Sequence, residues 1–228
     1  MLKYISRLIL MIESVNLNNI QKIKATLLDN PQLSLCIASK YASTTQISKL
    51  YENGFRVFGE NKIQDGIKKI SALSHLSDIK WHFIGHLQSN KVQKAIENFD
   101  VIQSIDSLKL LEKIDLVSKR LDKVSIGYIQ VNSGNDPKKF GFSLENIYKI
   151  KKEIFSFSNV KIQGIMIVAP NTDNNIDLEN IFKDSFKLYS DLCDEFKLDQ
   201  LSMGMSQDYK LAVKSGSTMI RIGRMLFT

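Results

Sequence analysis

The sequence has little of what a metal-stabilised or disulfide-stabilised protein needs. Only two cysteines, Cys36 and Cys193, occur in 228 residues, and they stand far apart. There is no Cys-x-x-Cys pair and no Cys/His cluster, so neither a zinc site nor a disulfide framework is indicated. His82 and His86 are four residues apart, but WHFIGH reads as a strand and a turn rather than a helix, so the spacing favours no metal site. We therefore predict a protein without a metal.

Long apolar runs are also missing. No run approaches the ~18–20 residues that a helix needs to span a bilayer. The first fifteen residues, MLKYISRLILMIESV, combine basic residues with a short apolar patch, but Glu13 interrupts the patch and no small-residue cleavage site follows. We predict a cytoplasmic protein that does not enter a membrane.

Arginine is scarce although the net charge is +7. A basic chain often binds nucleic acid through a continuous basic face. Here the basic residues are mostly lysines, and they are scattered along the chain and separated by acidic residues. The arginines are Arg7, Arg56, Arg120, Arg221 and Arg224. The charge therefore predicts solvated lysines on the surface and no nucleic-acid partner.

The hydrophobic pattern is that of alternating strands and helices. Short runs rich in Val, Ile and Phe alternate with amphipathic stretches at helical spacing. The eight runs that we interpret as strands are residues 35–40, 55–60, 81–85, 101–105, 126–132, 162–168, 201–206 and 219–225. Serines, threonines and aspartates stand where helix N-caps are needed, and an extra helix over about residues 17–28 precedes the first strand.

This pattern predicts one (β/α)8 barrel, an α/β fold, that occupies residues 1–228 as a single domain. Such barrels have roughly 250 residues, so the chain would be a compact one. An open, doubly wound sheet is the alternative, and the position of the eighth strand near the C-terminus favours a closed barrel. Neither GxGxxG nor GxxxxGK[ST] occurs, so no motif supports a dinucleotide fold or a nucleotide triphosphatase.

Ligands of such barrels bind at the C-terminal ends of the strands. Lys40 ends the first predicted strand, on the same face as Cys36 and Ala38 by parity. Burial there would lower the pKa of its amine and make it a Schiff-base former, while a lysine that snorkels at the rim is an equally open interpretation. Asn61 follows the second strand, in the segment FGEN.

The last two strands end with residues that suit an anion. Ser206 offers a hydroxyl near the start of a helix, and Gly223 lets backbone approach a ligand closely. Ser206 or Asp208 could equally be an ordinary helix cap. Arg221 precedes Gly223 by two residues and shares its strand face, so an inward Arg221 needs a carboxylate or a ligand atom as its partner.

These segments resemble a known family. ASK at 38–40, FGEN at 58–61, WHFIGHLQSNK at 81–91, LSMGMSQD at 201–208 and STMIRIGRMLF at 217–227 look like signature blocks of the pyridoxal phosphate homeostasis proteins. The blocks occur in order over essentially the whole chain. The resemblance implies a barrel like the N-terminal barrel of alanine racemase, and a protein that binds pyridoxal 5′-phosphate (PLP) and buffers or delivers it with little or no catalysis.

The resemblance also assigns roles to single residues. It makes Lys40 the lysine that forms an aldimine with PLP, Arg221 the residue facing the pyridine nitrogen, and Ser206 and Gly223 part of the phosphate cup. Asn61 would lie beside the ring. Because an arginine does not give up its proton, the ring nitrogen would stay unprotonated and the cofactor would be a weakened electron sink.

The sequence departs from the family pattern at three places. Tyr41-Ala42-Ser43 follow Lys40 where the family often has Lys and Pro, Thr228 follows Phe227 where glycine is commoner, and the loop DPKKFG at 136–141 is one residue longer than usual. None of these touches the predicted cofactor contacts, although the loop after Lys40 could differ in shape.

Two other functions compete with the carrier. One is a PLP enzyme of the same barrel type, such as an amino-acid racemase, which needs two bases on opposite faces of the bound substrate. In racemases the second base comes from an added C-terminal domain, which we do not expect here, and His82, Tyr41 and Cys36 are substitutes that nothing singles out. The other is a phosphosugar-type barrel enzyme without the cofactor. We expect a monomer whose partners are PLP and, on delivery, PLP-dependent apo-enzymes.

Overall fold

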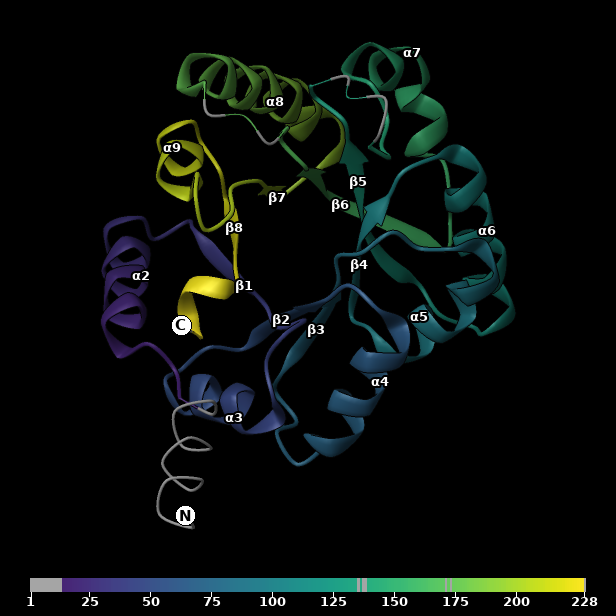
Figure 1. Ribbon diagram of the computed structural model, residues 1–228. Helices are drawn as coiled ribbons and strands as arrows, with labels where there is room; N and C mark the ends of the chain where they lie inside the picture. Colours follow the sequence, from purple (N-terminus) through teal and green to yellow (C-terminus); the bar gives the residue numbers. More distant parts are fainter. Residues whose placement is uncertain (1–13, 135, 137–138, 171, 173, 228) are drawn as a thin grey trace, which may run out of the picture.

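Eight parallel strands form a closed barrel with helices around it in the computed structural model of the chain (Figure 1). The structure describes residues 14–134, 136, 139–170, 172 and 174–227. Each strand pairs with its neighbour in sequence, and β1 pairs with both β2 and β8, which closes the ring. The strands are β1 (Ser34–Ala38), β2 (Val57–Glu60), β3 (Lys80–Phe83), β4 (Val101–Ile105), β5 (Ser125–Val131), β6 (Val160–Ile167), β7 (Gln200–Ser202) and β8 (Met219–Ile222). The predicted barrel is confirmed, and the open sheet is excluded.

The helices also lie where the periodicity predicts them. They are α2 (Leu17–Asp29), α3 (Thr44–Glu52), α4 (Ile63–Ala72), α5 (Val92–Asn98), α6 (Leu108–Arg120), α7 (Leu144–Ile154), α8 (Asn175–Phe196) and α9 (Tyr209–Lys214), with short 3-10 helices η1 (Ser89–Lys91) and η2 (Arg224–Leu226). α2 is the extra helix, and it lies beside η2 (Figure 1), where the Asn16 N–H donates to the Leu226 carbonyl and the Asn19 side chain donates to the Met225 carbonyl. The prediction about the N-terminus rests on residues 1–13, which lie outside the described residues. The single-domain prediction covers residues 1–228 and therefore lies partly outside them.

Local sequence sets the ends of several helices. The Ser43 side chain accepts from the Gln46 N–H while the Gln46 side chain accepts from the Ser43 N–H, a reciprocal capping box at the start of α3. Ser107 and Ser143 cap α6 and α7 with the side-chain oxygen alone, which accepts from one backbone N–H of the first turn. The prediction that the Asp208 side chain caps α9 is wrong, because its carboxylate accepts from the Met205 N–H and makes no cap bond to the helix.

Three strands are shorter than predicted at the ends that matter for a ligand. β1 ends at Ala38, because the Ala42 N–H bonds to the Ser39 carbonyl and closes a turn that contains Lys40 and Tyr41. β7 ends at Ser202, and Gly204 (φ +93°) then bends the backbone in a way that favours glycine. β8 ends at Ile222, where Gly223 opens η2. Lys40 and Ser206 therefore stand on loops, not on strands.

The core has two parts. The larger lies between the barrel and its helices and includes Ile37, Phe58 and Leu111. A smaller apolar cluster inside the barrel consists of Cys36, Val101, Tyr128, Met166 and Met219. On β4, the polar Gln103 follows Val101 by two residues and so shares its face. On β8, Arg221 follows Met219 in the same way. The barrel interior thus changes from apolar to polar toward the C-terminal ends of its strands.

Candidate functional site

Arg221 is a buried cation inside the barrel, with only 6% of its surface exposed. Its Nη1 donates to the Ser202 carbonyl (2.7 Å) and to Ser202 Oγ (2.8 Å), and its Nη2 donates to the Ile167 carbonyl (2.7 Å). Among the described residues no carboxylate forms an ion pair with it, and its Nε has no partner. Desolvation lowers the pKa of Arg221, an effect that the charges of Cys36 and Asp208 oppose. The Arg221 side chain therefore points into the barrel, as predicted.

An unpaired buried charge is costly unless something compensates for it. Arg221 has neutral oxygens as partners but no anion, and one edge of its guanidinium is left without an acceptor. The arrangement therefore suits a ligand that brings an acceptor atom and negative charge into the C-terminal mouth of the barrel.

Ser206 and Gly223 lie close to that mouth, on the loops after β7 and β8. The Arg221 N–H donates to the Gly204 carbonyl (2.9 Å), which holds the loop before Ser206 against β8. Ser206 is half-buried, and no described residue bonds to its hydroxyl or its backbone N–H. A Cβ on Gly223 would stand 2.9 Å from the Ala38 carbonyl, so only glycine fits there without a shift.

Lys40 follows two residues after Ala38, at the end of β1. Its side chain is exposed, and its amine lies over the Tyr41 ring, 5.1 Å from the centroid. The prediction that Lys40 continues the strand face of Cys36 and is desolvated is wrong, because the strand has already ended. The structure matches the other interpretation, a lysine at the rim.

Asn61 stands at the end of β2, held by a close approach of two backbones. A Cβ on Gly85 would come within 2.2 Å of the Asn61 carbonyl oxygen, which leaves no room for a side chain at Gly85. The five candidate residues thus lie on the C-terminal ends or following loops of β1, β2, β7 and β8, which are consecutive around the barrel. In the part of the chain that is described, no hydrogen bond or ion pair joins their side chains directly.

Comparison with known proteins shows which family the chain resembles. Residues 17–228 match the family described as the N-terminal domain of alanine racemase. A pyridoxal phosphate homeostasis protein of Synechocystis is 36% identical over 199 residues, which cover 86% of this chain and 91% of that protein. One of Aquifex aeolicus is 36% identical over 192 residues, 83% of this chain and 84% of that protein.

The chain belongs to the family of pyridoxal phosphate homeostasis proteins.

Solved structures agree with this membership. PipY of Synechococcus elongatus with PLP bound superposes with a TM-score of 0.83 at 34% identity, over 92% of this chain and all of that one. An alanine racemase of Clostridium difficile superposes with a TM-score of 0.74 at 16% identity, over 92% of this chain and 56% of that enzyme, which shows the shared fold. The predicted resemblance, both to the homeostasis proteins and to the racemase barrel, is confirmed.

Sequence reasoning missed a buried ion pair beneath Lys40 in this family member. Glu60 Oε1 accepts from Lys69 Nζ (2.8 Å) and from Ser39 Oγ (2.6 Å), and Lys69 Nζ also donates to the Ser39 carbonyl (2.7 Å). Glu60 is fully buried, and its Oε2 has no described partner. A glutamate in the otherwise apolar end of β2 was the available signal. The pair fixes Ser39, the residue before Lys40.

The two histidines that share a four-residue spacing have separate surroundings. His82 is buried in the barrel, and its Nδ1 lies 2.7 Å from Gln103 Nε2. His86 is exposed, pairs with Asp106 (3.0 Å) and stacks on Phe140 at 3.8 Å between ring centroids. WHFIGH is a strand and a turn, as predicted. Within the described ranges, no group of three or more His, Cys, Asp or Glu could hold a metal.

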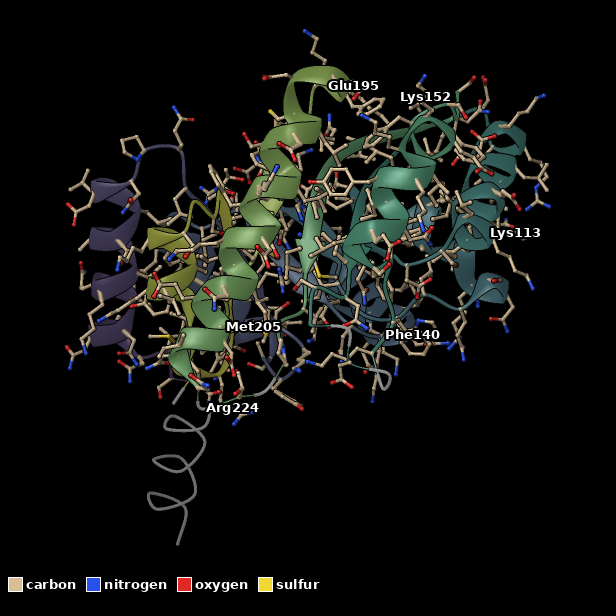
Figure 2. All side chains as sticks on the ribbon, turned by 90° about the horizontal axis from the view of Figure 1, so that it is seen from above. Lys113, Phe140, Lys152, Glu195, Met205 and Arg224 are labelled. Atoms are coloured by element: carbon tan, nitrogen blue, oxygen red, sulfur yellow. The ribbon has the colours of Figure 1, made fainter. Side chains whose placement is uncertain are left out.

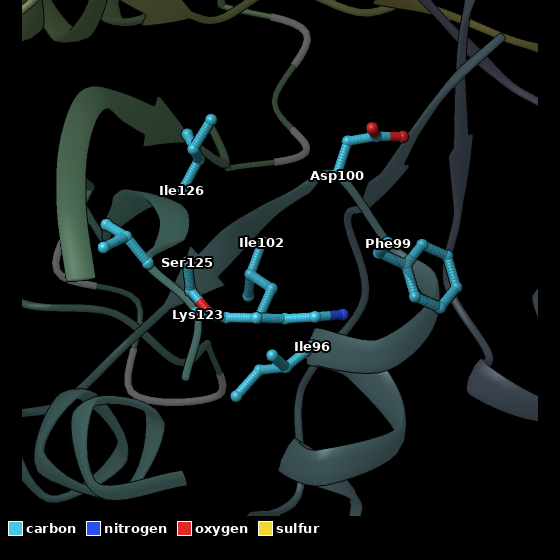
Figure 3. Close-up of a pocket in the computed structure, with 8 residues that line it drawn as sticks. Ile96, Phe99, Asp100, Ile102, Lys123, Ser125 and Ile126 are labelled. Carbon is cyan, nitrogen blue, oxygen red and sulfur yellow. The ribbon is translucent and has the colours of Figure 1, made fainter. Parts of the chain in front are cut away.

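Other hollows lie away from the five candidates. Figure 3 shows one at the N-terminal ends of β4 and β5, where Lys123 extends between Ile96 and Ile102. Another lies between the N-termini of α6 and α7 and is lined by Asp106, Ser107 and Phe142. Figure 2 shows Phe140, Met205 and Arg224 along one edge of the molecule, with Lys152 and Glu195 along the other. In the part of the chain that is described, no helix has the length and apolar character for a membrane span.

Proposed function

We propose that this chain binds pyridoxal 5′-phosphate through Lys40 and acts in PLP homeostasis, by buffering or delivering the cofactor, with little or no catalysis. Membership in the family of homeostasis proteins supports the role, and a relative at 34% identity whose structure holds PLP supports the ligand. The roles of the single residues rest on the geometry of this chain.

The buried charge of Arg221 is the observation that carries the proposal. PLP is an anion with an acceptor atom in its ring, and Arg221 is a buried cation with an Nε that has no described partner. Arg221 would donate to the ring nitrogen and, because it keeps its proton, would leave that nitrogen unprotonated. The residues present therefore fit the cofactor.

The other candidates fit around Arg221. The Lys40 amine would condense with the cofactor's aldehyde and release one water, leaving a Schiff base. Ser206 would donate its hydroxyl proton to the phosphate, and the absence of a side chain at Gly223 would allow backbone to approach it. Asn61 would lie beside the ring. These loops follow neighbouring strands, so one small ligand can reach them all.

Weak catalysis follows from the same residues. When bound, the cofactor supplies an electron-withdrawing ring, and Arg221 opposite the nitrogen weakens that withdrawal. A racemase also needs a second base. Burial raises the pKa of the Cys36 thiol to about 12, His82 Nδ1 is engaged by Gln103, and Tyr41 stands beside Lys40 itself. Neither Cys36 nor His82 Nδ1 is therefore a free base, and Tyr41 adjoins the lysine that would hold the cofactor.

Delivery implies partners, which we propose are PLP-dependent apo-enzymes. Large apolar side chains are exposed at the same end as Lys40, on loops at Tyr41, Phe140 and Met205 and in the first turn of α8 at Ile176. We further propose a monomer that works in the cytoplasm. Light scattering of the purified protein and fractionation of the source cell test these two statements.

A covalent trap tests the function. The protein with PLP is reduced with borohydride, and the modified lysine is located by mass spectrometry. We expect one adduct, on Lys40, that Lys40→Arg abolishes and that Lys62→Arg, an exposed lysine on the next loop, leaves in place. An adduct on another lysine would remove the assignment, and no adduct would remove the cofactor.

Proton exchange separates the carrier from a racemase. The PLP-loaded protein is incubated with L-amino acids in deuterated water, and deuterium at Cα is followed by NMR. A missing general base typically costs ~10²–10⁴ in rate, so we expect negligible exchange. Fast exchange that Lys40→Ala abolishes would place the protein among the enzymes.

A further inference from the structure

Three polar side chains cross the interior of the barrel without touching any candidate residue except Arg221. Gln103 on β4 and Ser202 on β7 are fully buried, and His82 on β3 is 5% exposed. Barrel interiors are normally filled with branched apolar side chains, and buried polar groups are costly unless each has a partner. The partners of these three are therefore informative.

The three side chains form one hydrogen-bonded chain that begins at Arg221, the Ser202–Gln103–His82 chain. Arg221 Nη1 donates to Ser202 Oγ (2.8 Å), and Ser202 Oγ donates to Gln103 Oε1 (2.8 Å). Gln103 Nε2 lies 2.7 Å from His82 Nδ1 and 3.3 Å from Met219 Sδ. Four residues from four strands are thus linked across the barrel.

Arg221 and the placement of the Gln103 amide together set the direction of the bonds in the chain. A guanidinium has only donors, so Ser202 Oγ accepts from it, and the Gln103 amide presents its oxygen, which accepts the proton of Ser202. The amide of Gln103 then presents its NH₂ group to His82 Nδ1, which must be the unprotonated nitrogen. The proton of the neutral ring therefore resides on Nε2. Burial lowers the pKa of His82 to about 4, which agrees with a neutral ring.

We infer that Ser202 and Gln103 are positioning residues that hold the guanidinium of Arg221 in the orientation that meets the cofactor's ring nitrogen, with His82 as the fixed end of the chain. The inference rests on the proposed function for the ligand, but the direction of the bonds does not. Arg221 is held on its Nη1 and Nη2 side by β7 and β6, which leaves Nε directed elsewhere.

The direction of the chain is tested without the cofactor. Nitrogen-15 signals of the His82 ring report which ring nitrogen carries the proton. We expect Nε2 in the unchanged protein. In Gln103→Glu the carboxylate can only accept, so the proton should move to Nδ1. An unchanged proton position in this variant would overturn the assigned direction. If it does not fold, Gln103→Met, which leaves Nδ1 without a donor, replaces it and should shift the Nδ1 signal.

The effect on the cofactor is tested with ¹⁵N-labelled PLP. Ser202→Ala removes one of the bonds that orient the Arg221 guanidinium, so the bond from Arg221 to the ring nitrogen should weaken. We expect the ring-nitrogen signal to shift and the dissociation constant of PLP to rise by up to about tenfold, the lower end of the usual worth of a hydrogen bond to a charged group. Ser104→Ala is the matched control, because Ser104 is equally buried and its hydroxyl has no described partner.

Two failures can be told apart. If Ser202→Ala and Ser104→Ala give the same ring-nitrogen signal and affinity as the unchanged protein, while Lys40 still carries the reduced adduct, the chain is only structural and the inference is wrong. If the unchanged protein gives no adduct on Lys40, the proposed function fails and takes the cofactor part of the inference with it. In that case the His82 signals still decide the direction of the bonds.

Discussion

Two charged groups are buried near the C-terminal ends of the strands, and their surroundings are opposite. Glu60 lies between the barrel and α4, where Lys69 supplies a cation at 2.8 Å and Ser39 a further donor. Arg221 lies inside the barrel, where its described partners are neutral oxygens of Ser202 and Ile167. One charge is compensated within the protein, and the other is not.

This difference separates a structural charge from a ligand-binding charge. A buried carboxylate that pairs with a cation of the same chain needs no ligand to compensate its charge, and breaking the pair leaves a charge without a partner. A buried cation held by dipoles alone is oriented but not neutralised. An anionic ligand can therefore interact with its charge without competing with an anion of the protein. We therefore expect substitutions at the Glu60–Lys69 pair to affect folding and substitutions around Arg221 to affect binding.

The largest effect should come from breaking the ion pair. Lys69→Met leaves Glu60 buried without its cation, which typically costs about 3–5 kcal/mol. Urea unfolding of the protein without ligand measures the free energy of unfolding. Lys68→Met, at an exposed neighbouring lysine, is the control and should change it by no more than about 0.5 kcal/mol. Equal changes in the two variants would contradict the structural role of the pair.

Acid should act on the barrel interior at His82. Burial lowers the pKa of His82 from 6.5 to about 4, so between these pH values the unfolded chain binds a proton that the folded chain does not. Stability is therefore fully present above pH 6.5 and is lost as the pH falls toward 4, by about 3 kcal/mol in all. The pH dependence of urea unfolding measures this loss. His82→Gln has no such group, and a variant that lost stability as steeply over the same window would refute the assignment.

The comparison also explains what the sequence could predict. Period-two and period-3.6 patterns found all eight strands, and strand parity placed Arg221 on the same face as Gly223, because these depend on local spacing. Parity failed at Lys40, since β1 ends at Ala38 and the chain turns at Ser39. Where a strand ends depends on pairing with its neighbours, which no local pattern contains.

The partners of the buried charges were out of reach for a related reason. Ser202 and Gln103 meet only because β4 and β7 face each other across a closed barrel, 99 residues apart in sequence. A polar residue within the apolar run VIQSI was visible, but its partner was not. Glu60 and Lys69 are nine residues apart, yet their contact depends on how α4 returns onto β2.

Stabilisation by bound PLP should distinguish the roles of the two buried charges, Glu60 and Arg221. A ligand at a hundred times its dissociation constant stabilises the folded protein by about 2.7 kcal/mol. We expect Lys69→Met to keep this increment, although its baseline stability is lower, and Arg221→Met to lose most of it. Urea unfolding with and without PLP, at the same concentration for all proteins, measures the increment. If Arg221→Met kept the full increment, the uncompensated charge would not be the ligand site.

The smallest effect concerns the phosphate end of the proposed site. The Ser206 hydroxyl has no described partner, so its removal should leave the folded protein as stable as before and cost only a bond to the ligand. A hydrogen bond to a charged group is worth about 1.5–3 kcal/mol, so Ser206→Ala should weaken PLP binding by about 10- to 150-fold. Pyridoxal, which has no phosphate, should bind weakly to both proteins and equally to each. Gln207→Ala, at the exposed next residue, is the control variant. Titrations of each protein with each ligand, followed by absorbance, give the dissociation constants. An equal loss of affinity for pyridoxal and PLP would place Ser206 away from the phosphate, because only a contact with that group can distinguish the two ligands.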